Sequence, residues 1–297
     1  MAPRPKLTAQ DKRLQALCGL TPAAFDRLQE AAVPVLLAQR AARADRPGRK
    51  RAVGGGRPRG LTPAQELLLT LIYLRHNVAH AVVGAIFGVS ADTSENTFHE
   101  VVQVLREVCP AQRWEAEKHW QKGQPAWQPE AEDCLLIDSF ETPVRRPSLD
   151  GAQRRVYSGK KKRHTLKTQV VTDGNGEVLE IDPGHRGPTN DKKLYEESGV
   201  TARYPDFQKY ADLGYQGATD LHLPHKKPKG GTLTAEQREA NREHAALRVH
   251  VEHGIRRLKS FRILRDEYRL ALGRFPQIAS VIVGLVHLVR IVGMASS

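Results

Sequence analysis

The sequence has few cysteines and no long uninterrupted apolar stretch. Its 297 residues include only Cys18, Cys109 and Cys134, which lie far apart and show no paired spacing. This pattern excludes a disulfide framework and a cysteine zinc site, and it indicates a reducing compartment. The most apolar segment, QIASVIVGLVHLVRIVGMA, is interrupted by His287 and Arg290. It predicts a buried C-terminal helix and no membrane span, which needs about 18 apolar residues.

The N-terminal stretch MAPRPKLTAQDKRL also lacks the apolar segment of an export signal. We therefore expect a cytoplasmic protein with no membrane partner. A hydrophobic content of 40% is sufficient for a substantial core, and the chain length allows one large domain or two modest ones.

Acidic residues are outnumbered: 33 Asp and Glu face 46 Lys and Arg, which gives a net charge of +13. Such a balance suits a partner made of phosphates, although an ordinary basic protein can have it too. The positions of the charges favour the first interpretation, because residues 145–167 contain nine basic residues and one acid. We expect DNA backbone contacts from Arg154, Arg155, Lys160, Lys161, Lys162, Arg163 and Lys167.

The first 130 residues are predicted to be a helical region. Residues 7–43 have a helical pattern, within which Thr21 and Pro22 open a helix. A basic linker rich in Gly and Pro follows, and Thr62 with Pro63 opens another helix. Residues 79–108 then divide into helix, tight turn and helix, with Gly88 ending the first and Ser90 or Thr93 capping the second. This is the layout of a DNA-binding helix-turn-helix, at about 62–108, but a purely structural helical hairpin fits as well. Possible base contacts are Asn96, Thr97 and His99.

Residues 131–297 are predicted to be an α/β domain. CLLIDSF reads as a strand, and HTLKTQVVTDGNGEVLEIDPG as two strands joined by a turn at 173–176. DKKLYEESGV is a short helix, FQKYADLGYQG and LHLPHK are further strands, and a long helix runs from Thr234 to about Arg262. This order is typical of a ribonuclease H-like fold.

Three acids of this region are candidates for chemistry. Asp138 and Asp212 follow apolar strands, where an unpaired carboxylate is costly to bury. Glu252 borders the apolar stripe of the last helix, four residues after Arg248. A hard divalent cation would suit these oxygens. Ordinary turn and salt-bridge roles, including an Arg248–Glu252 surface pair, are the alternatives.

Five stretches resemble the DDE transposases of bacterial insertion sequences, of the insertion-sequence-five type, whose catalytic domain is related to Harbinger-type endonucleases. They cover about residues 61–290 and are IDSFETPV, YSGKKKRHTLKTQVVTDGNGEVLEI, GPTNDKKLY, DLGYQG and RVHVEHGIRRLKSFRIL. The resemblance implies that Asp138, Asp212 and Glu252 are the catalytic, metal-binding acids. Arg248, Glu252 and Lys259 match the pattern Tyr-x2-Arg-x3-Glu-x6-Lys, with Ala245 at the tyrosine position. In GPTNDKKLY, Asn190 replaces the usual His and Asp191 is retained, so this loop supports the resemblance without an assigned role.

The resemblance further implies cleavage of the element ends and transfer of the 3′-hydroxyl strand to target DNA, with two Mg²⁺ or Mn²⁺ ions as cofactors. Arg248 and Lys259 would contact the phosphate under attack. The expected partners are the terminal inverted repeats, the target DNA and a second copy of the chain, in the bacterial cytoplasm at the nucleoid. Two alternatives remain: a host endonuclease of the same fold without strand transfer, and a helix-turn-helix regulator with structural acids.

Overall fold

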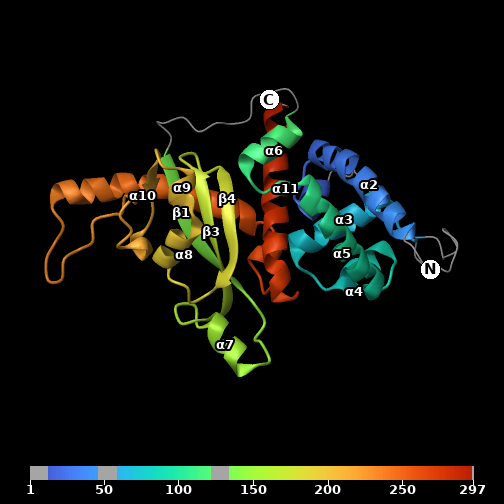
Figure 1. Cartoon of the computed structure of the whole chain (residues 1–297), viewed down its shortest axis with the longest axis horizontal. Coiled ribbons are helices and arrows are strands. Elements are labelled where there is room, and N and C mark those ends of the chain that lie inside the picture. The colour runs from blue at the N-terminus through green and yellow to red at the C-terminus, as the bar shows by residue number, and fades with distance from the viewer. Residues whose placement is uncertain (1–12, 46–58, 122–133, 296–297) are drawn as a thin grey trace.

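The computed structural model describes residues 13–45, 59–121 and 134–295. Helices from the N-terminal part lie on one side and a mixed sheet on the other, and the C-terminal helix stands between them (Figure 1). One continuous core contains side chains from both parts. The two predicted regions are therefore packed together through shared apolar contacts.

The N-terminal helices are α1 (Leu14–Cys18), α2 (Pro22–Ala44), α3 (Pro63–His76), α4 (His80–Phe87), α5 (Ala91–Val108) and α6 (Arg113–Trp120). Local chemistry explains their ends. Thr21 and Thr62 cap α2 and α3, each followed by a proline in the first turn. Gly88 ends α4 in the left-handed conformation and Ser90 caps α5, as the sequence predicts. The helix, tight turn and helix are thus confirmed. The helical pattern predicted over residues 7–43 corresponds to α1 and α2, and α2 begins at Pro22 after the Thr21 cap, as predicted. The first residues of this stretch lie outside the described ones.

The sheet contains β1 (Cys134–Pro143), β2 (Tyr157–Ser158), β3 (Arg163–Asp173), β4 (Val178–Arg186) and β5 (Gln208–Tyr210). β3 pairs antiparallel with β1 and with β4, whereas β5 pairs parallel with the other edge of β1. The predicted hairpin at 173–176 is confirmed, with Gly176 at φ +78°. The strand predicted for LHLPHK is wrong: within this segment only His222 forms a bridge, to Tyr210. Two prolines nearby and a single paired residue leave no ladder for a strand.

The remaining elements surround the sheet. They are α7 (Asp150–Val156), α8 (Asp191–Ser198), α9 (Val200–Arg203), η1 (Leu213–Tyr215), α10 (Ala235–Lys259), η2 (Arg262–Leu264), η3 (Leu272–Arg274) and α11 (Phe275–Ala295). The long helix predicted from Thr234 is α10, and its capping box with Gln237 is present. The apolar stripe of this helix, formed by Val251, Ile255 and Leu258, is buried against the sheet.

Helix α11 holds the two parts together. Within the described residues it belongs to the one segment that is long and apolar enough to cross a membrane, Leu272–Met294. Its side chains, however, are part of the core: Ile278, Val281, Ile282 and Leu285 are at most 1% exposed. The predicted buried C-terminal helix is confirmed, and packing against α5, α6 and β4 accounts for its apolar character.

Candidate active site

The first acid, Asp138, lies on the central strand β1. Its side chain is 17% exposed, and its Oδ1 accepts a 2.7 Å hydrogen bond from the backbone N–H of Ser139. Burial raises the pKa of Asp138 above the ordinary 3.8, the Arg248 guanidinium opposes this, and the charges of Asp212 and Asp191 add to it. A carboxylate that is costly to ionise therefore stands among other carboxylates.

Strand register brings Asp212 to the same edge as Asp138. β1 and β5 are parallel, and Leu136 is the partner of Tyr210. Asp138 lies two residues after Leu136, and Asp212 lies two residues after Tyr210. Both acids therefore lie just beyond the last paired residues of the two strands. Asp212 caps η1, with its Oδ1 accepting a 2.8 Å hydrogen bond from the Gly214 N–H. This hydrogen bond fixes the direction of the carboxylate.

Helix α10 contributes Arg248 and Glu252. One Arg248 nitrogen lies 3.4 Å from Asp138 Oδ2 and 3.9 Å from Asp212 Oδ2. Arg248 therefore faces the two aspartates and not Glu252, and the Arg248–Glu252 surface pair is not the arrangement that forms. Glu252 is exposed, and no hydrogen bond or ion pair within the described part of the chain reaches its carboxylate. It lines a pocket of about 250 Å³ together with Asp138.

Asp191 is a site residue to which sequence reasoning gave no role. It begins α8, which Asn190 caps, and it lines the same pocket as Asp138 and Glu252. Its Oδ1 accepts hydrogen bonds from the Ser139 hydroxyl, at 2.6 Å, and from Lys167 Nζ, at 3.0 Å. The only signal in the sequence was its place in GPTNDKKLY, beside a residue with cap chemistry.

Lys167 lies differently from what its place in the basic segment suggested. It is 6% exposed, and its Nζ is bound to Asp191 and to the Thr189 carbonyl. Lys167 cannot follow a DNA backbone over the surface, and it can meet only a phosphate that enters the pocket. β3 directs it inward because alternate residues of a strand face opposite sides of the sheet.

Lys259 reaches the pocket from the end of α10. Its Nζ lies 4.9 Å from the centre of the Phe140 ring, a cation–π contact. Burial lowers the pKa of Lys259 from 10.5, and the charge of Lys161 lowers it further. Lys160 and Lys161 line the same pocket. Cations and carboxylates thus face each other across it.

The other predicted DNA contacts are on the surface. Arg154 and Arg155 lie on α7, which projects beyond the sheet (Figure 1), and both are exposed. The turn between β2 and β3 exposes Lys160, Lys161 and Lys162, and Arg163 at the start of β3 is exposed as well. These six cations are therefore exposed to solvent, and their contacts with DNA phosphates stay a prediction.

In the helix-turn-helix, one predicted base contact is wrong. Thr97 is 4% exposed because it lies on the face of α5 that packs into the core. Asn96 is exposed. His99 is half-buried, 3.6 Å from Glu95, and bonded to Arg274. Of the three predicted base contacts, Asn96 and His99 keep some exposed surface, and their contact with DNA stays a prediction.

The oxygen donors do not form a finished metal site. Among residues 13–45, 59–121 and 134–295, no group of three His, Cys, Asp or Glu side chains is arranged to hold a metal ion. Arg248 supplies the positive charge between Asp138 and Asp212 instead. Its Nε is buried without a hydrogen-bond partner among these residues, so the guanidinium is not held firmly by both carboxylates.

Comparisons with known proteins show which family the chain resembles. Residues 137–287 match the family described as DDE superfamily endonuclease, and residues 59–110 match the helix-turn-helix of DDE superfamily endonuclease. The chain is 33% identical over 243 residues to a probable transposase for insertion sequence element IS702 from Microchaete diplosiphon, which covers 80% of this chain and 84% of the relative. It is 30% identical over 217 residues to a candidate transposase for insertion sequence element IS112 from Streptomyces albus G, covering 72% and 76%. No solved structure matches the chain.

Proposed function

This chain belongs to the DDE superfamily endonucleases of insertion-sequence transposases, and from this membership we propose that it cleaves the ends of an insertion sequence and joins the freed 3′-hydroxyl to target DNA. The catalytic acids in this proposal are Asp138, Asp212 and Glu252. A cytoplasmic location follows from the substrate, which is bacterial DNA.

The observation that carries the proposal is the shared neighbourhood of these acids. Asp138 and Asp212 lie within 3.4 and 3.9 Å of one Arg248 nitrogen, and Glu252 lines the pocket that contains Asp138. A regulator that only binds DNA has no use for three acids gathered beside cations. Three antiparallel strands with a parallel strand on the far side of β1 also support a ribonuclease H-like catalytic domain over residues 131–297.

The chemistry of the three acidic side chains is suited to binding divalent cations. The side chains are carboxylates, which are the hard oxygen ligands of Mg²⁺ and Mn²⁺. Burial, with a smaller contribution from the charges of Asp212 and Asp191, raises the pKa of Asp138, and a nearby cation would favour its ionised form. Asp138, Asp212 and Glu252 would hold the ions. Two such ions, when bound, activate the attacking oxygen and stabilise the leaving oxygen of a phosphodiester displacement.

The other residues of the pocket bind and orient the substrate. Lys259, Lys160 and Lys161 attract the backbone phosphate that enters, and Lys259 does so from a desolvated position where its charge acts strongly. Asp191 holds Ser139 next to Asp138 and is itself held by Lys167. This pair of hydrogen bonds keeps the β1 carboxylate in place while DNA is bound.

Recognition of the terminal inverted repeats falls to the helix-turn-helix of residues 59–110. In our proposal α5 presents Asn96 and His99 to the major groove. The exposed cations of α7 and of the β2–β3 turn contact the phosphate backbone without regard to sequence. Because transposition brings two ends together, the active form is a dimer on DNA.

The test uses a plasmid carrying the gene with its own flanking DNA, so that the element ends are present. The wild-type protein should cut at the ends in Mg²⁺, and chelation by EDTA should abolish cutting while DNA binding persists. Asp138→Asn, Asp212→Asn and Glu252→Gln should each lose cleavage and still bind DNA. Cutting by the triple variant would contradict the assignment.

A strand-transfer assay separates this proposal from the endonuclease alternative. A labelled, pre-cut element end is mixed with a target plasmid and Mg²⁺. A transposase joins the label covalently to the plasmid, whereas a host endonuclease releases fragments without joined products. Element ends that are cut but never joined would reduce the proposal to cleavage alone.

A further inference from the structure

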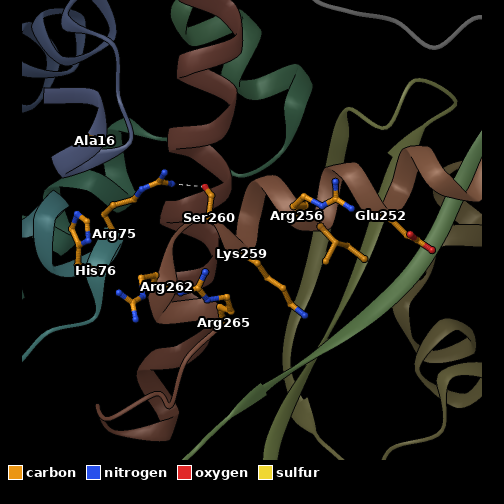
Figure 2. Close-up of a pocket in the computed structure, with 10 residues that line it drawn as sticks. Ala16, Arg75, His76, Glu252, Arg256, Lys259, Ser260, Arg262 and Arg265 are labelled. Atoms are coloured by element: carbon orange, nitrogen blue, oxygen red, sulfur yellow. Dashed lines mark hydrogen bonds between the residues drawn. The ribbon is translucent and has the colours of Figure 1, made fainter. Parts of the chain in front are cut away.

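A second, larger pocket lies beside the acidic one, between the helical part and the end of α10. Its volume is about 720 Å³, and its wall comes from α1, α3, α10 and the segment that follows α10 (Figure 2). The residues that line it are Ala16, Arg75, His76, Glu252, Ile255, Arg256, Lys259, Ser260, Arg262 and Arg265. Four arginines and one lysine thus face a single acid.

The excess positive charge in this pocket is only partly neutralised. Asp266 pairs with Arg262 and Arg265, at 2.7 and 2.9 Å. Arg75 and Arg256, by contrast, form no ion pair with an acid anywhere in the described segments. Arg75 donates to the Ser260 hydroxyl at 2.5 Å, across the boundary between the helical part and α10 (Figure 2). Grouping cations without acids is unfavourable unless a polyanion joins them.

The environment of Arg75 also indicates that this pocket is suited to binding an anion. Burial lowers its pKa from the ordinary 12.5, and the charge of Arg265 lowers it further, while the anionic form of Cys18 would oppose the change. Its guanidinium also lies 5.4 Å from the centre of the Phe261 ring. A partly desolvated guanidinium held in place by Phe261 and Ser260 loses little freedom when it binds an anion.

The two pockets are neighbours because they share wall residues. Glu252, Ile255 and Lys259 line both. In Figure 2, Lys259 and Glu252 extend from α10 away from Arg75 and Arg262, on the side that leads to the sheet. A DNA strand carries one phosphate per 3.4 Å of helix axis, so a strand with one phosphodiester at Asp138 must place others close by.

We propose that this pocket binds the backbone phosphates next to the scissile one, with Arg75 and Arg256 as their contacts. The proposal rests on the function proposed above and adds a subsite to it. Because Arg75 belongs to α3 and Arg256 to α10, bound DNA links the helical part to the catalytic part at this point.

The experiment compares two double variants that remove the same charge. Arg75→Gln with Arg256→Gln changes the pocket, whereas Arg238→Gln with Arg242→Gln removes two exposed cations elsewhere on α10. Binding to a fluorescent duplex of about 30 base pairs is measured in EDTA over a range of salt concentrations. Log affinity decreases linearly with log salt, and the magnitude of this slope should be smaller by about 2 in the pocket variant, which is about 1 for each lost phosphate contact. The control variant should keep the wild-type slope.

Two further measurements guard against a folding defect in the double variant. Arg256→Gln alone affects an exposed residue and should lower the slope by about 1. In the wild-type protein, the duplex should protect Arg75 and Arg256, but not Arg238, from phenylglyoxal. Wild-type slopes in the pocket variants, or equal modification of all three arginines, would overturn the proposal.

These outcomes are separable from those of the transposase proposal. Glu252→Gln should keep the wild-type salt dependence and bind the duplex with equal or higher affinity, because the substitution removes the one acid that lines the pocket. If the pocket variants show the reduced salt dependence but the wild-type protein cuts no element ends, the pocket proposal holds and the catalytic proposal fails. If it cuts the ends and the pocket double variant binds and cuts equally well, the pocket proposal fails alone.

Discussion

Helix α10 carries three residues of the site, and its position on the sheet depends on two glycines. A Cβ added at Gly254 would lie 2.9 Å from the Gly176 carbonyl oxygen and 3.1 Å from Thr172 Cγ2. A Cβ at Gly176 would lie 2.2 Å from the His250 carbonyl oxygen, and Gly176 has φ +78°. The backbone of α10 thus touches the β3–β4 turn directly, near Glu252. We predict that Gly254→Ala moves the helix and impairs cleavage.

The magnitude follows from the contact. An ordinary Cβ contact begins at 3.4 Å, so the alanine must move away from the carbonyl oxygen by about 0.5 Å. Overpacking of this kind costs about 1–3 kcal/mol, and the better helix propensity of alanine returns up to about 1 kcal/mol. The net loss of stability is therefore about 0–3 kcal/mol. A misplacement of about 1 Å can cost about a hundredfold in rate, so a shift half as large should reduce cleavage by about tenfold.

Chemical denaturation measures the stability, and single-turnover cleavage of pre-bound element ends measures the rate. Gly293→Ala is the matched control, because it lies in helix α11 with open space around its added Cβ. It should gain up to about 1 kcal/mol and cleave normally. Gly176→Ala should be worse than Gly254→Ala, since its clash is closer and its φ is positive. A Gly254→Ala protein that cuts at the wild-type rate would refute the idea that this contact positions α10.

Three other predictions concern single side chains. The pKa of Asp138 is raised in the folded protein, so its ionisation destabilises the fold as the pH rises through that pKa. In EDTA, the Asp138→Asn variant should therefore be more thermally stable than the wild type at pH 7 but not at pH 3. Equal differences in melting temperature at both pH values would refute this. Lys167→Met leaves Asp191 without its cation and should lower Mg²⁺-dependent cleavage by about 10- to 100-fold with DNA binding retained, as titration with Mg²⁺ can test. Arg113→Leu removes the buried ion-pair partner of Asp173, 2.7 Å away, and should lower the free energy of unfolding by about 3–5 kcal/mol, as chemical denaturation can measure. A loss under about 1 kcal/mol would show that the backbone hydrogen bonds of the turn stabilise the Asp173 carboxylate without Arg113.

Local features could be predicted from the sequence because their causes lie within a few residues. Thr62 and Thr234 each form a capping box with a glutamine three residues later. The turn at 173–176 depends on Asp173 accepting hydrogen bonds from the backbone N–H groups of Asn175 and Glu177. Side-chain capping and turn chemistry need no distant partner, so their sequence signals are reliable.

Failures occurred where a side chain's direction depends on distant packing. Thr97 and Lys167 belong to segments that looked available to DNA, yet both are buried. LHLPHK has the apolar alternation of a strand, but the place beside β5 gives it one bridge only. Propensity and charge density identify a segment, whereas the sheet register and the face on which a helix packs decide where each side chain points.

The candidate site divides in the same way. The sequence by itself determined the chemical types: acids after two apolar strands, an acid on a helix, and cations in excess around them. Only the tertiary structure decided the partners. It paired Arg248 with Asp138 and Asp212, brought Asp191 against Ser139, and opened a basic pocket between α3 and α10. These contacts join residues far apart in the chain, and their geometry is set by the parallel pairing of β1 with β5 and by the packing of α10, which no short stretch of sequence encodes.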